Sequence, residues 1–237
     1  MKNLKKLKKN FDNNGFIVIK KFLSIAEIKQ FEKSLLKIYS NITKKKLTHF
    51  NIHKAFIYDE KNKNFDLLYT YIKKFNISSP YKKIKKKFSN LSKQIFKNKY
   101  KYLNSGMAIG IKGSKRTAYD WHQEQSYYSV KNTIHFQFPI ITKARKTNGT
   151  MSVLKGSQKA GPINKVKNIK LSKKSINTFL PKNINNLKKI FKEVYINMDL
   201  GDVCMFSENI VHKTNKSYSN KVRFVPIIRL QSTVLKK

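Results

Sequence analysis

The stretch that decides the fold is Tyr-Asp-Trp-His-Gln-Glu-Gln-Ser-Tyr-Tyr, residues 119–128. It contains His122 and Glu124, which are two positions apart. Side chains at i and i+2 of a β-strand project from the same face. We therefore expect a strand here, on which an imidazole and a carboxylate share one space. These are two of the three ligands of the 2-His-1-carboxylate triad, which leaves positions open on a ferrous iron.

The third ligand should be a distant histidine, and His212 in Phe-Ser-Glu-Asn-Ile-Val-His-Lys-Thr (206–214) is the candidate. Arg223 follows it by 11 residues and Arg229 by 17. The planar fork of an arginine can hold a carboxylate through two hydrogen bonds. The two arginines are separated by an even number of residues, so strand parity does not choose between them.

From about residue 101 the apolar residues follow a period of two, in short segments separated by turn signals. Many short strands of this kind are typical of a double-sheet jelly roll. We predict strands at 133–141, 193–199, 203–206, 210–214 and 222–230, and a hairpin turn at Asn148-Gly149. The predicted fold class is mainly β with buttressing helices, a double-stranded β-helix (jelly roll, cupin-like).

The first part of the chain predicts mostly helices after a short strand at 15–22. Ser24 and Glu27 form a capping-box pattern before a helix, and Ser79-Pro80 predicts the start of another. We expect a loop over 43–65, a helix near 65–76 and an irregular lysine-rich segment over 162–192. The chain is interpreted as one domain, 1–237, with a mostly helical buttress (1–100) and a β core (101–237).

Composition limits the class of protein. The chain has 237 residues, a formal charge of +40 and one cysteine, Cys204, so it can form no intrachain disulfide. We find no membrane-span pattern and no signal-peptide pattern at the N-terminus, and we expect a cytoplasmic protein. The basic residues are nearly all lysine, beside abundant Asn and Ile, which indicates an A/T-rich coding sequence rather than a specific nucleic-acid site.

At this point the sequence resembles the phytanoyl-CoA dioxygenase family of iron(II)- and 2-oxoglutarate-dependent oxygenases. The similarity extends over most of the chain, in an order and spacing that no single motif would establish. The matching stretches are Asn14–Ser24, Trp121–Glu124, Asn148–Met151, Gly156-Ser157, Gly201–Val203, His212 and Arg223.

The resemblance implies Fe(II) held by His122, Glu124 and His212, with 2-oxoglutarate as co-substrate and hydroxylation of a small molecule as the reaction. It also implies that Arg223, by its spacing from His212, binds the far carboxylate of 2-oxoglutarate and that Thr214 assists. The sequence departs from the family at Glu124, where aspartate is commoner, and at Lys155–Gln158, where Pro-Gly-Ser-His is frequent. Relatives that halogenate lack the carboxylate, so Glu124 favours hydroxylation.

Two other functions stay open from the sequence. One is a catalytically inactive jelly-roll protein that binds a ligand or a partner. The other is a basic nucleic-acid-binding protein, whose binding would fall steeply with salt. The substrate is not identified. Because both ends of 162–192 should lie near the iron, we expect this stretch to cover the site and to favour an anionic substrate.

Overall fold

A computed structural model describes residues 2–62, 72–76, 79–114, 117–126, 131–167 and 179–233. Its helices are α1 (Lys2–Asn14), α2 (Ile25–Thr43), α3 (Ile52–Lys61), α5 (Ser79–Phe96) and α6 (Ile184–Ile190), with 3-10 turns at Glu124–Ser126 and Ser157–Ala160. Its strands are β1 (Phe16–Ile19), β2 (Tyr100–Gly110), β3 (Thr133–Gln137), β4 (Met151–Leu154), β5 (Lys165–Lys167), β6 (Phe179–Pro181), β7 (Glu193–Tyr195), β8 (Val203–Ser207), β9 (His212–Thr214) and β10 (Arg223–Ser232).

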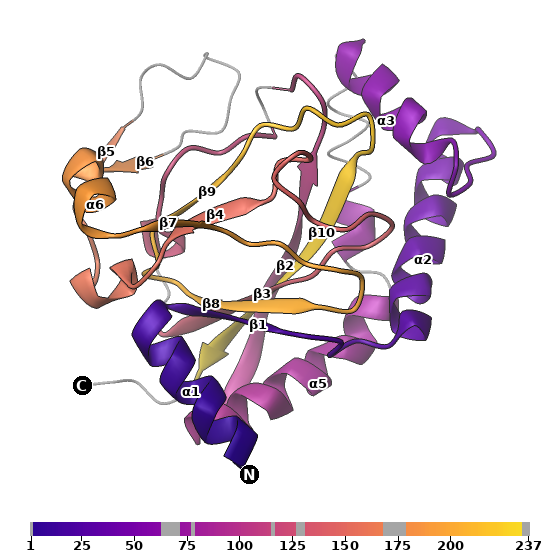
Figure 1. Cartoon of the computed structure of the whole chain (residues 1–237). Helices are drawn as coiled ribbons and strands as arrows, with labels where there is room; N and C mark the ends of the chain where they lie inside the picture. Colours follow the sequence, from indigo (N-terminus) through magenta and orange to yellow (C-terminus); the bar gives the residue numbers. More distant parts are fainter. Residues whose placement is uncertain are drawn as a thin grey trace.

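Two antiparallel sheets form the β core. The larger has the strand order β1-β8-β3-β10-β2 and the smaller β7-β4-β9, while β5 and β6 make a separate pair. Neighbours in the larger sheet are far apart in sequence, which is the connectivity of a jelly roll rather than of successive hairpins. Figure 1 shows the smaller sheet beside the larger one, with α2 and α5 on the opposite side of the larger sheet. The predicted fold class is confirmed.

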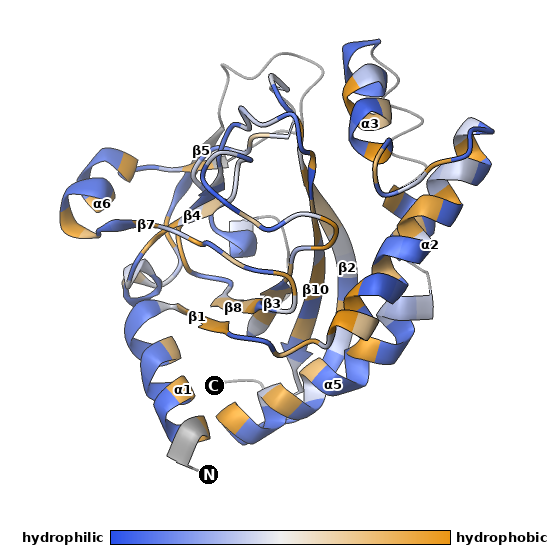
Figure 2. Cartoon of the chain, turned by 45° about the vertical axis from the view of Figure 1, so that its right-hand side comes forward, coloured by the Kyte–Doolittle hydropathy of each residue, from blue (hydrophilic) through white to orange (hydrophobic). Residues whose placement is uncertain are grey.

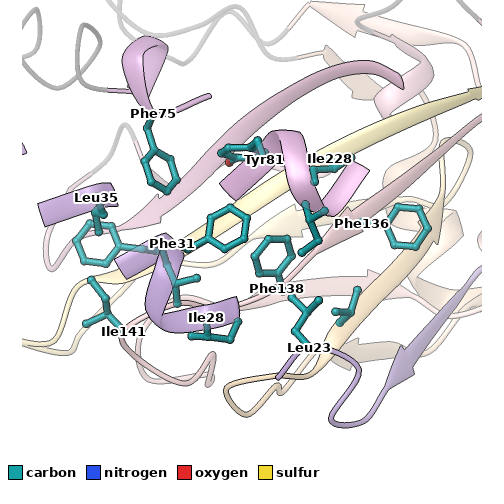
Figure 3. Packing of buried hydrophobic residues seen from close by; sticks show 14 of the residues in the cluster. Leu23, Ile28, Phe31, Leu35, Phe75, Tyr81, Phe136, Phe138, Ile141 and Ile228 are labelled. Atoms are coloured by element: carbon teal, nitrogen blue, oxygen red, sulfur yellow. The ribbon is translucent and has the colours of Figure 1, made fainter. Parts of the chain in front are cut away.

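The main hydrophobic core lies between the helices and the outer face of the larger sheet. Phe88 of α5 stacks on Phe136 of β3 with ring centroids 4.4 Å apart, and Phe31 of α2 meets Phe138 edge-on at 5.1 Å. Figure 3 shows Phe31, Phe136 and Phe138 in this core. Phe136 and Phe138 are completely buried. Burying each such ring contributes about 1.5–3 kcal/mol. This layer holds the larger sheet rigid behind the site.

The helices form because their apolar residues recur at helical spacing. Ile28, Phe31, Leu35 and Tyr39 are the buried residues of α2, and Figure 2 shows hydrophobic and hydrophilic residues alternating along both α2 and α5. At the start of α2 the predicted capping box is present, since Glu27 N donates to Ser24 Oγ and Ser24 N donates to Glu27 Oε2. Two of the backbone N–H groups at the helix start are thereby satisfied.

Strand parity places the other face of the larger sheet against the smaller one. On β3, Ile134 and Phe136 belong to the main core, so His135 lies on the inner face. On β10, Phe224 and Ile228 belong to the same core, so both arginines of that strand lie on the inner face. A second apolar cluster fills one part of the space between the sheets: Ala144, Met151, Val153, Ile196, Met198, Cys204, Phe206 and Ile210. Polar side chains occupy the rest.

Several local expectations were wrong. The expected loop over 43–65 contains α3, whose Ile52 and Phe56 are buried against the core. Asn148-Gly149 is a turn with Gly149 at φ 78°, but it connects two different sheets rather than the strands of a hairpin. The segment 162–192 includes β5, β6 and α6. Helix α1 was not predicted, although Leu4, Leu7 and Phe11 have helical spacing and pack on the core.

The expected helix near 65–76 falls partly outside the described residues, of which 72–76 are helical. None of the helices in the described ranges has the length and apolar character that crossing a membrane requires.

Candidate metal centre

His122 and His212 lie side by side because their backbones pair. His122 N donates to His212 O at 2.8 Å, and His212 N donates to His122 O at 2.9 Å. This antiparallel bridge connects the segment before the Glu124 turn to the start of β9. It places the two imidazole rings 4.2 Å apart between centroids, and both residues are buried.

Each of the two rings meets a backbone oxygen through the same nitrogen, Nδ1. His122 Nδ1 lies 2.6 Å from Asp120 O, and His212 Nδ1 lies 3.0 Å from Ile210 O. A carbonyl oxygen can only accept, so each Nδ1 carries the hydrogen and each Nε2 of a neutral ring keeps its lone pair. Backbone carbonyls commonly orient metal-binding histidines in this way.

Glu124 completes the group. Its Oε1 lies 3.5 Å from His212 Nε2 and 3.9 Å from His122 Nε2. One potential ligand atom of each residue lies within 4.8 Å of the other two. Two imidazole nitrogens and one carboxylate oxygen are a donor set that suits iron(II) and leaves positions open on it.

The expected strand through His122 and Glu124 is wrong, although the side chains do converge. Glu124 begins a 3-10 turn that runs to Ser126. Gln123, between the two residues, has its amide tied on both sides: Nε2 donates to Gly161 O at 2.9 Å and to Asn209 O at 2.6 Å, while Oε1 accepts from Ile163 N at 2.9 Å. This anchor fixes the backbone where it turns, so a turn and not strand parity brings the carboxylate to the histidines.

The charges at this centre are set by burial and by one neighbouring cation. Burial would raise the pKa of Glu124, but the charge of Arg229 and the contacts with His122 and His212 outweigh it, and the pKa lies well below its usual range. Burial is the main cause of the lowered pKa of His212. The centre therefore holds an ionised carboxylate and keeps the His212 imidazole neutral, as ligation of a metal requires.

Arg223 lies on the inner face of β10 with 2% of its surface exposed. Its Nε donates to Asn148 O at 3.2 Å, and its Nη2 is buried without a hydrogen-bond partner. Burial lowers its pKa to about 10, so it is charged at neutral pH. Among the residues that the structure describes, no carboxylate pairs with it. A buried cation without a counter-ion is costly, so this side chain is suited to receive an anionic ligand.

Arg229 differs from Arg223 in this respect. Its Nε donates to Glu124 Oε2 at 3.2 Å, and its Nη1 donates to Asn104 Oδ1 at 3.2 Å. The charge of this second arginine is thus already matched by a carboxylate of the protein. The ambiguity that the sequence left between the two arginines becomes a clear structural difference.

Thr214 is half-buried and lies two residues after His212 on β9, opposite Met151 of β4. Residues two apart on a strand share a face, so its side chain lies on the same side of the smaller sheet as the His212 imidazole. Its backbone N donates to Tyr119 O at 2.9 Å.

His135 is a neighbour of the centre, and it is not among the candidate site residues predicted from the sequence. It is completely buried, and its Nδ1 lies 3.7 Å from Glu124 Oε2 without a hydrogen-bond partner. Burial lowers its pKa to about 3 and keeps it neutral. The alternation over 133–137 already predicts that His135 and Gln137 oppose the apolar face, and this signal could have placed His135 near Glu124.

The comparisons with known proteins agree with this geometry. Residues 11–225 match the phytanoyl-CoA dioxygenase (PhyH) family. The match covers most of the sequence, and the chain belongs to this family. It is therefore a member of the class of non-haem iron- and 2-oxoglutarate-dependent oxygenases, and the buried donor set of His122, Glu124 and His212 fits an iron ion. No curated protein matches the chain.

Solved structures share the fold at low sequence identity. EctD from S. alaskensis, with 2-oxoglutarate and 5-hydroxyectoine, is 14% identical with a TM-score of 0.64, over 95% of this chain and 75% of EctD. The epimerase SnoN, in complex with Fe3+, alpha ketoglutarate and nogalamycin RO, is 8% identical with a TM-score of 0.68, over 97% and 84%. AviO1 from Streptomyces viridochromogenes Tue57 is 12% identical with a TM-score of 0.60, over 98% and 96%.

Proposed function

We propose that this protein is an iron(II)- and 2-oxoglutarate-dependent oxygenase that hydroxylates a small molecule. The observations that carry the proposal are the buried triad and a buried arginine without an acidic partner among the described residues, Arg223, on the face of β10 that also carries the Glu124 partner Arg229. A triad alone would fit many metal sites. Arg223, which has a free Nη2 and no acidic partner among the described residues, adds a place for the distant carboxylate of a dicarboxylate co-substrate.

In this proposal His122 and His212 donate their Nε2 lone pairs and Glu124 donates Oε1 to the metal. When bound, iron(II) and 2-oxoglutarate supply oxygen activation, with 2-oxoglutarate converted to succinate and CO2. Arg223 orients the co-substrate through two N–H···O bonds to its far carboxylate, and the hydroxyl of Thr214 adds a third donor. The apolar cluster between the two sheets excludes water from one side of this space.

For the substrate we propose a small anion, such as a phosphate-bearing metabolite. The support comes from the start of the lysine-rich segment 162–192. Ile163 N donates to Gln123 Oε1, and Lys165 Nζ donates to Ser126 O at 2.6 Å. Both acceptors flank Glu124, so this end of the segment is attached to the turn that carries the carboxylate ligand. Cations along the segment would attract an anion towards the centre.

The test is to supply the protein with Fe(II), 2-oxoglutarate, oxygen and a panel of metabolites, and to measure succinate and product mass. We expect succinate formation that depends on one metabolite and disappears in His122→Ala. We also expect a product that has gained one oxygen atom. A converted metabolite without added oxygen would rule out hydroxylation while leaving the oxygenase class intact; epimerisation is such an outcome, and SnoN is described as an epimerase. No succinate with any metabolite, together with no metal binding, would rule out the enzyme altogether.

A further inference from the structure

We propose that Arg229 is a positioning residue for Glu124, which holds the outer carboxylate oxygen so that the inner one is presented to the metal. The inference rests on the proposed function, because it takes Glu124 as a metal ligand. It concerns a residue that touches neither the metal nor the co-substrate in that proposal.

The two oxygens of Glu124 face different neighbours. Oε1 lies 3.5 Å from His212 Nε2, on the side where the metal would bind. Oε2 lies 3.2 Å from Arg229 Nε and 3.7 Å from His135 Nδ1. The carboxylate therefore bridges the histidine pair and β10, and its orientation depends on what Oε2 can bind.

Of these two neighbours, only Arg229 has a hydrogen to give to Oε2. Thr133 Oγ1 lies 2.8 Å from Glu208 Oε2 and 2.9 Å from His135 Nε2. The Glu208 carboxylate also accepts from Asn132 N and Thr133 N, so the single Thr133 hydroxyl hydrogen is donated to it. Thr133 Oγ1 must then accept from His135 Nε2, which leaves only a lone pair on Nδ1 of the neutral ring. His135 contacts Oε2 but does not hold it.

The larger sheet provides a defined place for the Arg229 guanidinium. Arg229 pairs with Asn104 in the register of β10 and β2, and Asn104 Oδ1 accepts from its Nη1. Gly106 is next along the same face of β2, and a Cβ built there would lie 3.3 Å from Nη1. The guanidinium is thus held by a hydrogen bond at its tip and has space because residue 106 has no side chain.

An oxygen that is held by Arg229 is not available to the metal. A carboxylate that turned freely could bind through both oxygens and fill a position that the co-substrate or oxygen needs. With Oε2 bound to Arg229, Glu124 is expected to bind through Oε1 alone. Partners that orient a metal ligand in this way typically contribute about 10- to 100-fold to metal affinity or activity.

The experiment measures binding of Co(II), a redox-stable substitute for Fe(II), without 2-oxoglutarate, by titration and by its visible absorption spectrum. We compare Arg229→Met with Arg229→Gln. Gln Nε2 stands at the same number of bonds from the backbone as Arg Nε, so Gln can keep the donor without the charge. We expect Arg229→Met to weaken Co(II) binding about 10- to 100-fold and to change the spectrum, and Arg229→Gln to recover most of both. Arg145→Met removes an arginine that is paired with Asp199 away from the centre, and should match the wild type.

Equal Co(II) affinity and equal spectra for the wild type and Arg229→Met would overturn the proposal. Equal losses in the Met and Gln variants would also overturn it, because charge rather than the hydrogen bond would then be responsible. If Arg229→Met does not fold by circular dichroism, Gly106→Val displaces the guanidinium while keeping its charge, and should weaken Co(II) binding to a similar degree; unchanged binding in that variant would contradict the proposal. Failure of the proposed function is separate: the wild type would then not bind Co(II), or His122→Ala would bind it equally well.

Discussion

Gly110 lies opposite Arg223 in the antiparallel register of β2 and β10, and the absence of a side chain at 110 makes room for the guanidinium. A Cβ built at residue 110 would lie 3.1 Å from Arg223 Nε and 2.6 Å from Asn148 O. The same carbonyl accepts the hydrogen bond from Arg223 Nε. Gly110 and Asn148 together therefore fix where the unpaired guanidinium lies.

Replacing Gly110 should impair co-substrate binding selectively. In Gly110→Ala the new methyl group cannot remain 2.6 Å from a backbone oxygen, so Asn148 or Arg223 must move. We expect the KM for 2-oxoglutarate to rise about 10-fold or more, equivalent to about 1.4 kcal/mol. Steady-state kinetics measure this, with Co(II) affinity as the control, which should not change. A normal KM in this variant would mean that Arg223 does not bind the co-substrate from its present position.

The two arginines of β10 should have separable effects. Removing one partner of a buried charge pair costs about 2–5 kcal/mol, or about 30-fold to several thousandfold in binding. Arg223→Met should raise the KM for 2-oxoglutarate within that range, and Arg223→Lys should recover part of the loss. Arg229→Lys should affect the KM for 2-oxoglutarate far less. If only the Arg229 variant raises the KM for 2-oxoglutarate, Arg229 and not Arg223 binds the co-substrate.

Removing the metal should lower the stability of the fold. A ligand that binds only the folded state at 100 times its Kd adds about 2.7 kcal/mol, and for a chain of this size about 1 kcal/mol corresponds to about 2–4 °C in Tm. We expect protein treated with a chelator to melt about 5–10 °C below protein saturated with Mn(II) or Fe(II). His212→Ala should show no such difference, and an equal Tm with and without metal in the wild type would argue against a metal site.

The sequence predicted that the three residues of the centre converge, but it did not predict their local structure correctly. His122, Glu124 and His212 are close together, as expected, but the strand argument that led to them is wrong because Gln123 fixes a turn between them. Hydrogen bonds from one side chain to Gly161, Ile163 and Asn209 involve residues far along the chain, and no local pattern reveals them. The choice between Arg223 and Arg229 could not be made from parity, since it depends on which guanidinium reaches Glu124.

The helices show the same limit. The start signals at Ser24–Glu27 and Ser79-Pro80 were sufficient to predict α2 and α5. Both helices also have one buried apolar face. Helix α3 was missed since Ile52-His-Lys-Ala-Phe-Ile-Tyr is short and follows a polar stretch. Its burial depends on the aromatic contact of Phe56 with Phe224 of β10, with ring centroids 4.8 Å apart.

Asp202 should make stability depend on pH in the acid range. It is 2% exposed, and it accepts from Lys20 Nζ, Lys21 N and Asp199 N. Burial would raise its pKa, but these hydrogen bonds outweigh it and lower the pKa. A folded-state pKa below the unfolded one gives stability that is present above the unfolded pKa, about 3.9, and is lost as the pH falls through the folded pKa.

Asp202→Asn should therefore cost about 1–3 kcal/mol of unfolding free energy at pH 7, and the difference from the wild type should shrink below about pH 4. Lys20 is mostly exposed, so solvent screens its share and the two backbone donors should dominate. Urea unfolding at pH 7, 5, 4 and 3 measures the difference. If the difference in unfolding free energy between Asp202→Asn and the wild type is the same at every pH, the charge of the Asp202 carboxylate does not contribute to stability.

The lysine-rich segment 162–192 should affect substrate choice through its charge. Lys165 is attached to the Glu124 turn through Ser126 O, and Lys167 is the last residue of β5, while Lys170 lies outside the described residues. With an acidic substrate found in the metabolite panel, the triple variant Lys165→Gln, Lys167→Gln, Lys170→Gln should raise the substrate KM severalfold at low salt. The difference should narrow at moderate salt, because the Debye length falls from about 30 Å at 0.01 M to about 8 Å at 0.15 M. The KM for 2-oxoglutarate, which Arg223 is proposed to bind, should be the same in both proteins. If the KM for the acidic substrate is unchanged at both salt concentrations, these lysines are only solvated surface residues. The charge of the segment would then play no part in selecting the substrate.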